Sequence, residues 1–162
     1  MEELVMAYTV DLVAVPEQAI AGIRERGPVA ALGSRVRRLR QALEEAGLQP
    51  AGPLMARYFE DWREDGDVDY EVAVPVLQGL DGWVPDRIGK ARGDFIPAHH
   101  AFATEHRGPL GGLEAAFTAV ARELETLGYT AAGPATAVYV RSPEDTDDPS
   151  GYVTVVRLPY AR

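Results

Sequence analysis

An internal repeat is the feature that most constrains how this chain can fold. The tripeptide Arg-Gly-Pro occurs at 26–28 and 107–109, and Ala-Gly-Pro occurs at 51–53 and 132–134, so each recurs after 81 residues. Leucine, glutamate and glycine positions between the two tripeptides recur at the same spacing. A constant offset over such a stretch indicates a duplicated unit, and two copies favour a pseudo-twofold pair over a solenoid.

Each repeat has the same order of predicted elements. A strand region, at about 8–25 or 94–106, ends at Arg-Gly-Pro, where proline suits the first position of a helix. Apolar residues at steps of three and four then predict one amphipathic helix per repeat, at 29–46 and 110–127. Two more strands follow Ala-Gly-Pro, at about 54–60 and 67–76 in the first repeat and at about 135–141 and 152–160 in the second.

This order predicts an α+β fold: a duplicated β-α-β-β module with pseudo-twofold symmetry, an antiparallel sheet and both helices on one face. Pro16 is expected to break the first strand, and Gly47 and Gly128 stand where left-handed helix C-caps are expected. We predict a single domain over 1–162, with the first repeat at about 8–76, a linker at 77–93 and the second repeat at about 94–160.

Composition narrows the function. The net charge of −9 and the pI near 4.8 repel a phosphate backbone and argue against direct nucleic-acid binding, whereas small cations are attracted. The chain has no cysteine for thiol chemistry, and no apolar run approaches the roughly 20 residues that cross a bilayer. We therefore expect a cytoplasmic protein without membrane contact. The acidic segments 60–69 and 141–151 are expected to be solvated hairpin loops.

The repeat also supplies an internal alignment of the last strands. Matching the prolines of "AVPV" and "RLPY" pairs Glu71 with Val155. An apolar residue such as Val155 is poorly placed against water, so this face of the sheet is expected to be covered or concave, with Glu71 near apolar surface. A carboxylate there needs hydrogen bonds or a cationic partner. Arg157 offers an alternative, since an ion pair with Glu71 across the twofold would fill the site with protein.

The repeated motifs resemble a known family. The motif "R-G-P" before each helix, "A-G-P-x-x-A-x-Y" after it and "D-Y-E-V-A-V-P-V" at the end of the first repeat are similar to the GyrI-like small-molecule-binding domain. This domain is the effector-binding part of multidrug-responsive regulators of the MerR and AraC types. The resemblance implies a curved sheet with a ligand cleft near the pseudo-twofold axis, lined by aromatic residues and an acid. It also implies lipophilic ligands, often cationic and aromatic.

The resemblance assigns roles to particular residues. Glu71 matches the acidic position of the cleft, and Tyr58 and Tyr139 match the aromatic position after each Ala-Gly-Pro. Many members carry Trp-Arg-Thr-Glu before the last proline, where this chain has Tyr152 and, in place of the glutamate, Val155. That departure leaves a cationic and a neutral ligand both open. Trp62 and Trp83 lie in connections, where the walls of clefts are often built, and we count both, with Arg157, as candidate ligand-binding residues.

The predicted function is a stand-alone protein that binds a lipophilic compound for sensing or sequestration, since both predicted helices are needed on the sheet and none is left to read DNA. Two alternatives stay open. Some relatives resemble hydrolases of strained compounds, which would here use Glu71 with Tyr58 or Tyr139. An interaction module of the gyrase-inhibitor type would instead use its acidic surface to contact a protein partner. The three histidines are not spaced to chelate together, so no metal and no cofactor is expected.

Overall fold

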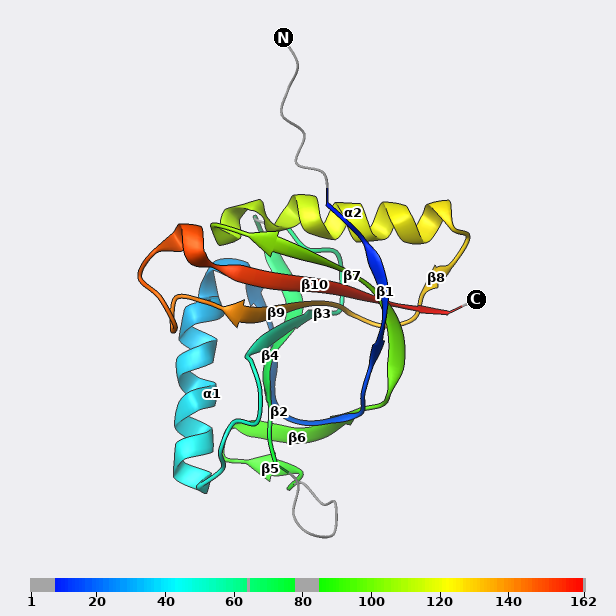
Figure 1. Ribbon diagram of the computed structural model, residues 1–162. Helices are drawn as coiled ribbons and strands as arrows, with labels where there is room; N and C mark the ends of the chain where they lie inside the picture. The colour runs from blue at the N-terminus through cyan, green and yellow to red at the C-terminus, as the bar shows by residue number, and fades with distance from the viewer. Residues whose placement is uncertain (1–7, 64, 78–84, 162) are drawn as a thin grey trace.

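The computed structural model describes residues 8–63, 65–77 and 85–161. These residues form ten strands and two α-helices (Figure 1). The strands are β1 (Asp11–Val15), β2 (Gln18–Pro28), β3 (Met55–Tyr58), β4 (Asp67–Pro75), β5 (Arg87–Ile88), β6 (Ala91–Ile96), β7 (His99–Arg107), β8 (Thr130–Ala131), β9 (Ala135–Arg141) and β10 (Val153–Ala161). The helices are α1 (Leu32–Ala46) and α2 (Leu113–Thr126), each preceded by one 3-10 turn.

The strands form one antiparallel sheet, in the order β1-β7-β10-β9-β3-β4-β2-β6-β5, with β8 beside the end of β10. The two repeats meet at its centre, where β3 pairs with β9 and Ala56 lies opposite Ala137. These two alanines are 81 residues apart, so the approximate twofold axis passes between them. The predicted α+β fold, with a duplicated module and a curved antiparallel sheet, is confirmed.

The first strand of each repeat pairs with the other repeat. β1 lies beside β7 of the second repeat, and β6 lies beside β2 of the first. Pro16 and Pro97, again 81 residues apart, interrupt the two strand regions at the same point. The expected break at Pro16 separates β1 from β2, which confirms that prediction, whereas the matching break at Pro97 between β6 and β7 was not predicted. The segment 77–93, predicted as a linker, contains β5 and the start of β6.

The helices begin and end where the sequence predicts. Each opens with the 3-10 turn that follows Arg-Gly-Pro. Beyond the ends of α1 and α2, Gly47 and Gly128 have φ angles of 68° and 78°, which confirms the left-handed caps. The apolar stripes of both helices pack on the same face of the sheet, Leu39 of α1 and Val120 of α2 among them. Within the described residues, no helix is long and apolar enough to cross a membrane.

The sheet therefore has a helix face and an opposite face, which carries no helix. In β4 the residues Val68, Tyr70, Val72 and Val74 are fully buried on the helix face, as the alternation predicts. The opposite face holds a smaller apolar cluster of Ile20, Met55, Ala73 and Val138, with Ile96 and Val155 packed against it. The predicted site residues are divided between these two faces.

Candidate functional site

Tyr58 and Tyr139, the two predicted cleft tyrosines, lie on the helix face and meet at the twofold axis. The Tyr139 hydroxyl donates a hydrogen bond to the Tyr58 oxygen, which also accepts one from the indole N–H of Trp62. Burial raises the pKa of Tyr58 to about 12 and raises the pKa of Tyr139 well above its ordinary value. Both phenols are therefore neutral near pH 7 and serve as a buried polar junction between the repeats.

Glu71 lies on the opposite face, where its Oε1 is 2.7 Å from Nη1 of Arg57 on the adjacent strand β3. The two side chains are 13% and 15% exposed, so the pair is largely shielded from water. Gly22 makes room for the carboxylate, because a Cβ there would lie 2.8 Å from Oε2 of Glu71. Burial raises the pKa of Glu71, although Arg57 opposes that shift. The alternative ion pair of Glu71 with Arg157 does not form, because Arg57 of the same repeat is the cationic partner of Glu71.

The sheet separates the residues of the predicted hydrolase. Glu71 points to the opposite face, whereas Tyr58 and Tyr139 point to the helix face. Adjacent residues of a strand alternate between faces, so Arg57 and Tyr58 cannot share one. A glutamate and a tyrosine that act on one substrate must reach the same atoms, and the fold does not bring these together. The prediction that Glu71 acts with Tyr58 or Tyr139 as a catalytic group is therefore wrong.

A cavity does lie near the twofold axis on the opposite face, but it is small. Its volume is about 40 Å³, and its walls include Val15 and Ile96, which are 81 residues apart and come from the two exchanged strands. On the same measure a water molecule needs about 10–15 Å³, and a cavity that binds benzene has about 150 Å³. The cavity therefore holds a small polar group and excludes an aromatic ring. Arg57 and Arg157 both line it.

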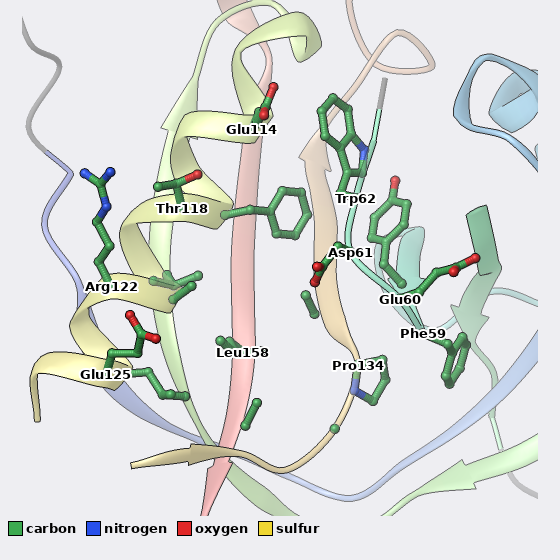
Figure 2. Close-up of a pocket in the computed structure, with 18 residues that line it drawn as sticks. Phe59, Glu60, Asp61, Trp62, Glu114, Thr118, Arg122, Glu125, Pro134 and Leu158 are labelled. Atoms are coloured by element: carbon green, nitrogen blue, oxygen red, sulfur yellow. The ribbon is translucent and has the colours of Figure 1, made fainter. Parts of the chain in front are cut away.

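The larger hollow lies on the helix face, along α2, and has a volume of about 790 Å³ (Figure 2). We call it the α2 groove. One wall is α2, the other is the segment 58–62 at and after the end of β3, and the floor includes Pro134 and Leu158. Its apolar lining comprises Tyr58, Phe59, Trp62, Phe117, Val120, Ala121, Leu124, Ala131, Pro134, Ala135 and Leu158. This volume accommodates a drug-sized molecule.

Aromatic rings meet at one end of the α2 groove. The rings of Trp62 and Phe117 are nearly parallel, at 20°, with centroids 6.4 Å apart. Tyr58 meets Phe117 edge-on, with centroids 5.6 Å apart. Along α2 the neighbouring positions are small, Thr118 and Ala121, which leaves the groove open beside the rings. The site therefore presents π-faces and edges on one side and free space on the other.

Acidic side chains flank these aromatic rings. Glu60 is held by Arg26 and accepts the backbone N–H of Asp69. The other acids of the lining, Asp61, Glu114 and Glu125, form no ion pair with any described residue. Figure 2 shows Glu114 and Glu125 on the helix and Asp61 across from them. Arg122 is the one cationic residue in the described lining, so the groove carries an excess of negative charge.

The structure brings together only some of the predicted ligand residues. Tyr58 and Trp62 line the α2 groove, whereas Tyr139 is buried beneath it. Val155 lies on the opposite face, in a shallow hollow with Asp11 and Glu105. Trp83 lies outside the described residues.

Sequence reasoning missed Phe117, which it assigned only to the apolar stripe of α2, and Arg57, the partner of Glu71. The alternation of β3 could have indicated Arg57, since a buried Tyr58 puts Arg57 on the face of Glu71.

The fold is consistent with what comparisons with known proteins find. The model of the GyrI-like small molecule binding domain matches residues 8–161, so the chain belongs to the GyrI-like family. The resemblance that the repeated motifs indicate is thereby confirmed. No curated protein sequence matches the chain.

Solved structures share the fold at low sequence identity. The C-terminal domain of EcmrR has a TM-score of 0.86 at 20% identity, with 97% of this chain and 99% of that domain covered. In an EcmrR–DNA complex the chain matches 60% of the EcmrR chain, also with a TM-score of 0.86 and 20% identity, over 99% of this chain. SAV2435 bound to tetraphenylphosphonium has a TM-score of 0.63 at 18% identity, with 96% and 94% covered.

Proposed function

We propose that this protein binds a lipophilic, cationic aromatic compound in the α2 groove, for sensing or sequestration. One observation carries the proposal: the aromatic pair of Trp62 and Phe117 is flanked by carboxylates, three of which have no ion-pair partner among the described residues. Aromatic faces attract a cation through the ring quadrupole and bind flat apolar groups of many shapes. The unpaired carboxylates then select for positive charge.

The charge of the whole chain acts in the same direction. A net charge of −9 raises the local concentration of cations and repels anions on approach. The groove adds a local excess, because its described lining contains four acidic residues and one arginine. A neutral ligand of the same shape would gain the stacking but not the electrostatic attraction. The ligand class that the resemblance implies is thus supported, at a place other than Glu71.

The relatives agree with this ligand class without establishing it. SAV2435 was solved with tetraphenylphosphonium, a lipophilic cation, and EcmrR was solved with DNA. At identities of 20% and below these likenesses show the fold alone. We therefore carry the cationic class to this chain from the chemistry of the α2 groove and use tetraphenylphosphonium as a test compound.

Calorimetric titration with tetraphenylphosphonium tests the proposal, with neutral triphenylphosphine oxide as the matched ligand. We expect the cation to bind at least tenfold more tightly than the neutral compound, with an affinity that falls as salt rises. Trp62→Leu should weaken binding of both ligands, because it removes the stacking surface. Glu114→Gln should weaken binding of the cation alone, by about threefold to tenfold.

Glu123→Gln is the control, because Glu123 is on the same helix but does not line the groove. It removes the same charge from α2 and should change the affinity by less than twofold. Equal affinities for the cation and the neutral compound would contradict the predicted charge selection. Binding that is unchanged in Trp62→Leu would place the ligand elsewhere and overturn the proposal.

A further inference from the structure

The cavity at the twofold axis on the opposite face is lined by two arginines, and only one of them has a counter-ion. Arg57 is bonded to Glu71 at 2.7 Å. Arg157 forms no ion pair or hydrogen bond with any side chain or backbone group that the structure describes. The alternation of β10 places it on the same face as Val155, toward the apolar cluster. A guanidinium is thus held at a protein cavity without a carboxylate.

The acids of this face do not supply the missing partner. Glu71 is bonded to Arg57, and Asp69 forms two hydrogen bonds with Arg24, at 2.7 and 3.0 Å. Asp94 is exposed and accepts the backbone N–H of Phe95. Glu105 is paired with Arg107 at 2.9 Å, and Asp11, which lies across Ala103 from Arg157, forms no ion pair with it. The desolvation of Arg157 is therefore offset by no described carboxylate, and burial alone lowers its pKa. A partly buried cation of this kind favours an anion from solution.

Comparison of the repeats shows that the symmetric architecture does not require this arginine. The counterpart of Arg157 in the first repeat is Ala73, which is fully buried in the small apolar cluster. An alanine-sized residue therefore satisfies the same place in the sheet. Arg157 is a feature of the second repeat alone, at the edge of a cavity that the twofold axis creates.

We propose that Arg157 binds the carboxylate group of a small apolar acid in this cavity. The volume of about 40 Å³ matches one carboxylate and no more, so the body of the acid must lie at the mouth. The apolar part of the lining includes Val15, Met55 and Ile96 from three strands, and its uncharged polar part comprises Gln18, His99 and Thr136. A guanidinium presents paired N–H donors in the geometry of a carboxylate, which it binds with two parallel hydrogen bonds.

A monoanion fits better than a phosphate. Arg157 is the single unpaired cation of the described cavity lining, so a second negative charge would have no counterpart. The net charge of −9 also opposes a dianion more strongly than a monoanion. This site is distinct from the α2 groove, because the two linings share only Pro134 and the two sites prefer opposite charges.

Titration of the whole protein with benzoate, followed by calorimetry and by amide NMR, tests this site. We expect saturable binding with shifts at the amides of β10 and at the Nε–H of Arg157. Arg157→Gln should raise the benzoate Kd at least tenfold, because a charge-assisted pair of hydrogen bonds is lost. Neutral benzamide should bind at least tenfold more weakly than benzoate. The Nε–H shift reports on the wild type, so the test does not depend on how a variant folds.

Arg122→Gln is the matched control, since Arg122 also lines a hollow without an ion pair, but on the helix face. It should leave benzoate affinity unchanged, and saturating tetraphenylphosphonium should do the same. Benzoate binding that persists in Arg157→Gln, equals that of benzamide or leaves the Arg157 Nε–H unshifted would overturn the carboxylate site. Each of these results leaves the proposal for the α2 groove standing, and failure of tetraphenylphosphonium to bind leaves the carboxylate site standing.

Discussion

The two repeats have the same backbone arrangement but different side chains at corresponding buried positions. In the first repeat Arg35 of α1 is buried, lies over the ring of Tyr70 and donates a hydrogen bond to the Tyr70 carbonyl at 2.8 Å. The corresponding residues of the second repeat are Ala116 and Thr154, both fully buried. Thr154 Oγ1 has no hydrogen-bond partner among the described atoms. Charge and aromatic stacking in one repeat are thus replaced by small side chains in the other.

Although these side chains differ, one requirement of the backbone is the same in both repeats. The carbonyl of the proline that precedes each helix needs a donor, and in the first repeat the Tyr70 hydroxyl supplies it to Pro28 at 2.9 Å. In the second repeat Nε2 of His106 lies 2.9 Å from the Pro109 carbonyl. A carbonyl only accepts, so Nε2 carries the proton, and in the neutral ring Nδ1 accepts from Tyr8 at 2.7 Å. The backbone constrains the repeats, and the side chains that satisfy it differ.

The side-chain differences between the repeats also affect the groove beside each helix. In the first repeat Arg40 of α1 forms an ion pair at 2.8 Å with Glu144 of the acidic loop, across the position that corresponds to the α2 groove. The counterpart of Arg40 in α2 is Ala121, which lines the open groove. We infer that the duplicated module became asymmetric through charged side chains that close one copy, while small ones leave the other accessible.

The largest effect is expected from Arg35→Ala. The variant loses a buried hydrogen bond to a carbonyl and the contact with the Tyr70 ring, and it leaves the space of a buried arginine side chain empty. We expect a loss of about 3 kcal/mol in the free energy of unfolding, measured by urea denaturation. Arg37→Ala on the same helix is the control, because Arg37 is exposed, and it should cost less than about 0.5 kcal/mol. Equal losses in the two variants would contradict the comparison.

The next effect tests the packing around Glu71. Gly22→Ala places a Cβ 2.8 Å from Glu71 Oε2, so the carboxylate must move away from Arg57. We expect a loss of about 2 kcal/mol in the free energy of unfolding. The second repeat has Ala103 and Val155 at these positions, so Gly22→Ala should be nearly neutral in a Glu71→Val background. Urea denaturation of the four proteins measures the coupling, and additive losses would show that the clash is relieved elsewhere.

The fold was predictable because its signals are local and doubled. The 81-residue offset and the apolar stripes of α1 and α2 lie in the sequence itself. The pairing of β1 and β6 with strands of the other repeat could not be predicted, because strand pairing over such distances leaves no local pattern in the sequence. The candidate site was harder to predict than the fold. Which face Tyr58 occupies depends on the register of β3 against β4, and that register places Tyr58 opposite Tyr70. No spacing in the sequence determines it.

The internal alignment of the repeats indicates the α2 groove only weakly. The basic residues Arg37 and Arg40 of α1 correspond to Thr118 and Ala121 of α2. That contrast shows that the basic surface is not shared, but small residues on a helix predict a groove only once the opposite wall is known. Here the opposite wall is the segment that carries Trp62, and it follows a strand whose register the sequence does not determine.

Ala121→Arg should close the α2 groove as Arg40 closes its counterpart. The new side chain extends across the groove toward Asp61 and the aromatic rings, and it adds a second cation to the lining. We expect the Kd for tetraphenylphosphonium to rise about tenfold, or about 1.4 kcal/mol, by calorimetry. Arg40→Ala should not affect the affinity for this ligand. An unchanged affinity in Ala121→Arg would show that the groove in the second repeat is not the binding site.

The smallest effect is a pH dependence that only the first repeat contains, since Glu71 corresponds to Val155. Burial raises the pKa of Glu71 above the 4.5 expected when the chain is unfolded, so the folded protein binds this proton more tightly. The resulting stability is complete below pH 4.5 and is lost as pH rises through the folded pKa. Urea denaturation between pH 4 and pH 8 should therefore show wild type losing stability relative to Glu71→Gln as pH rises.

Asp69, two residues earlier in β4, should show the opposite sign. Its hydrogen bonds to Arg24 lower its pKa, so the stability it contributes is present above the unfolded pKa and is lost as pH falls. Wild type should thus gain stability relative to Asp69→Asn as pH rises through the acidic range. Both carboxylates have an arginine partner, and they differ in burial, since the Asp69 side chain is 32% exposed and that of Glu71 13%. Slopes of the same sign would mean that Arg57 outweighs burial at Glu71, and the covered opposite face would then have little influence on its charge.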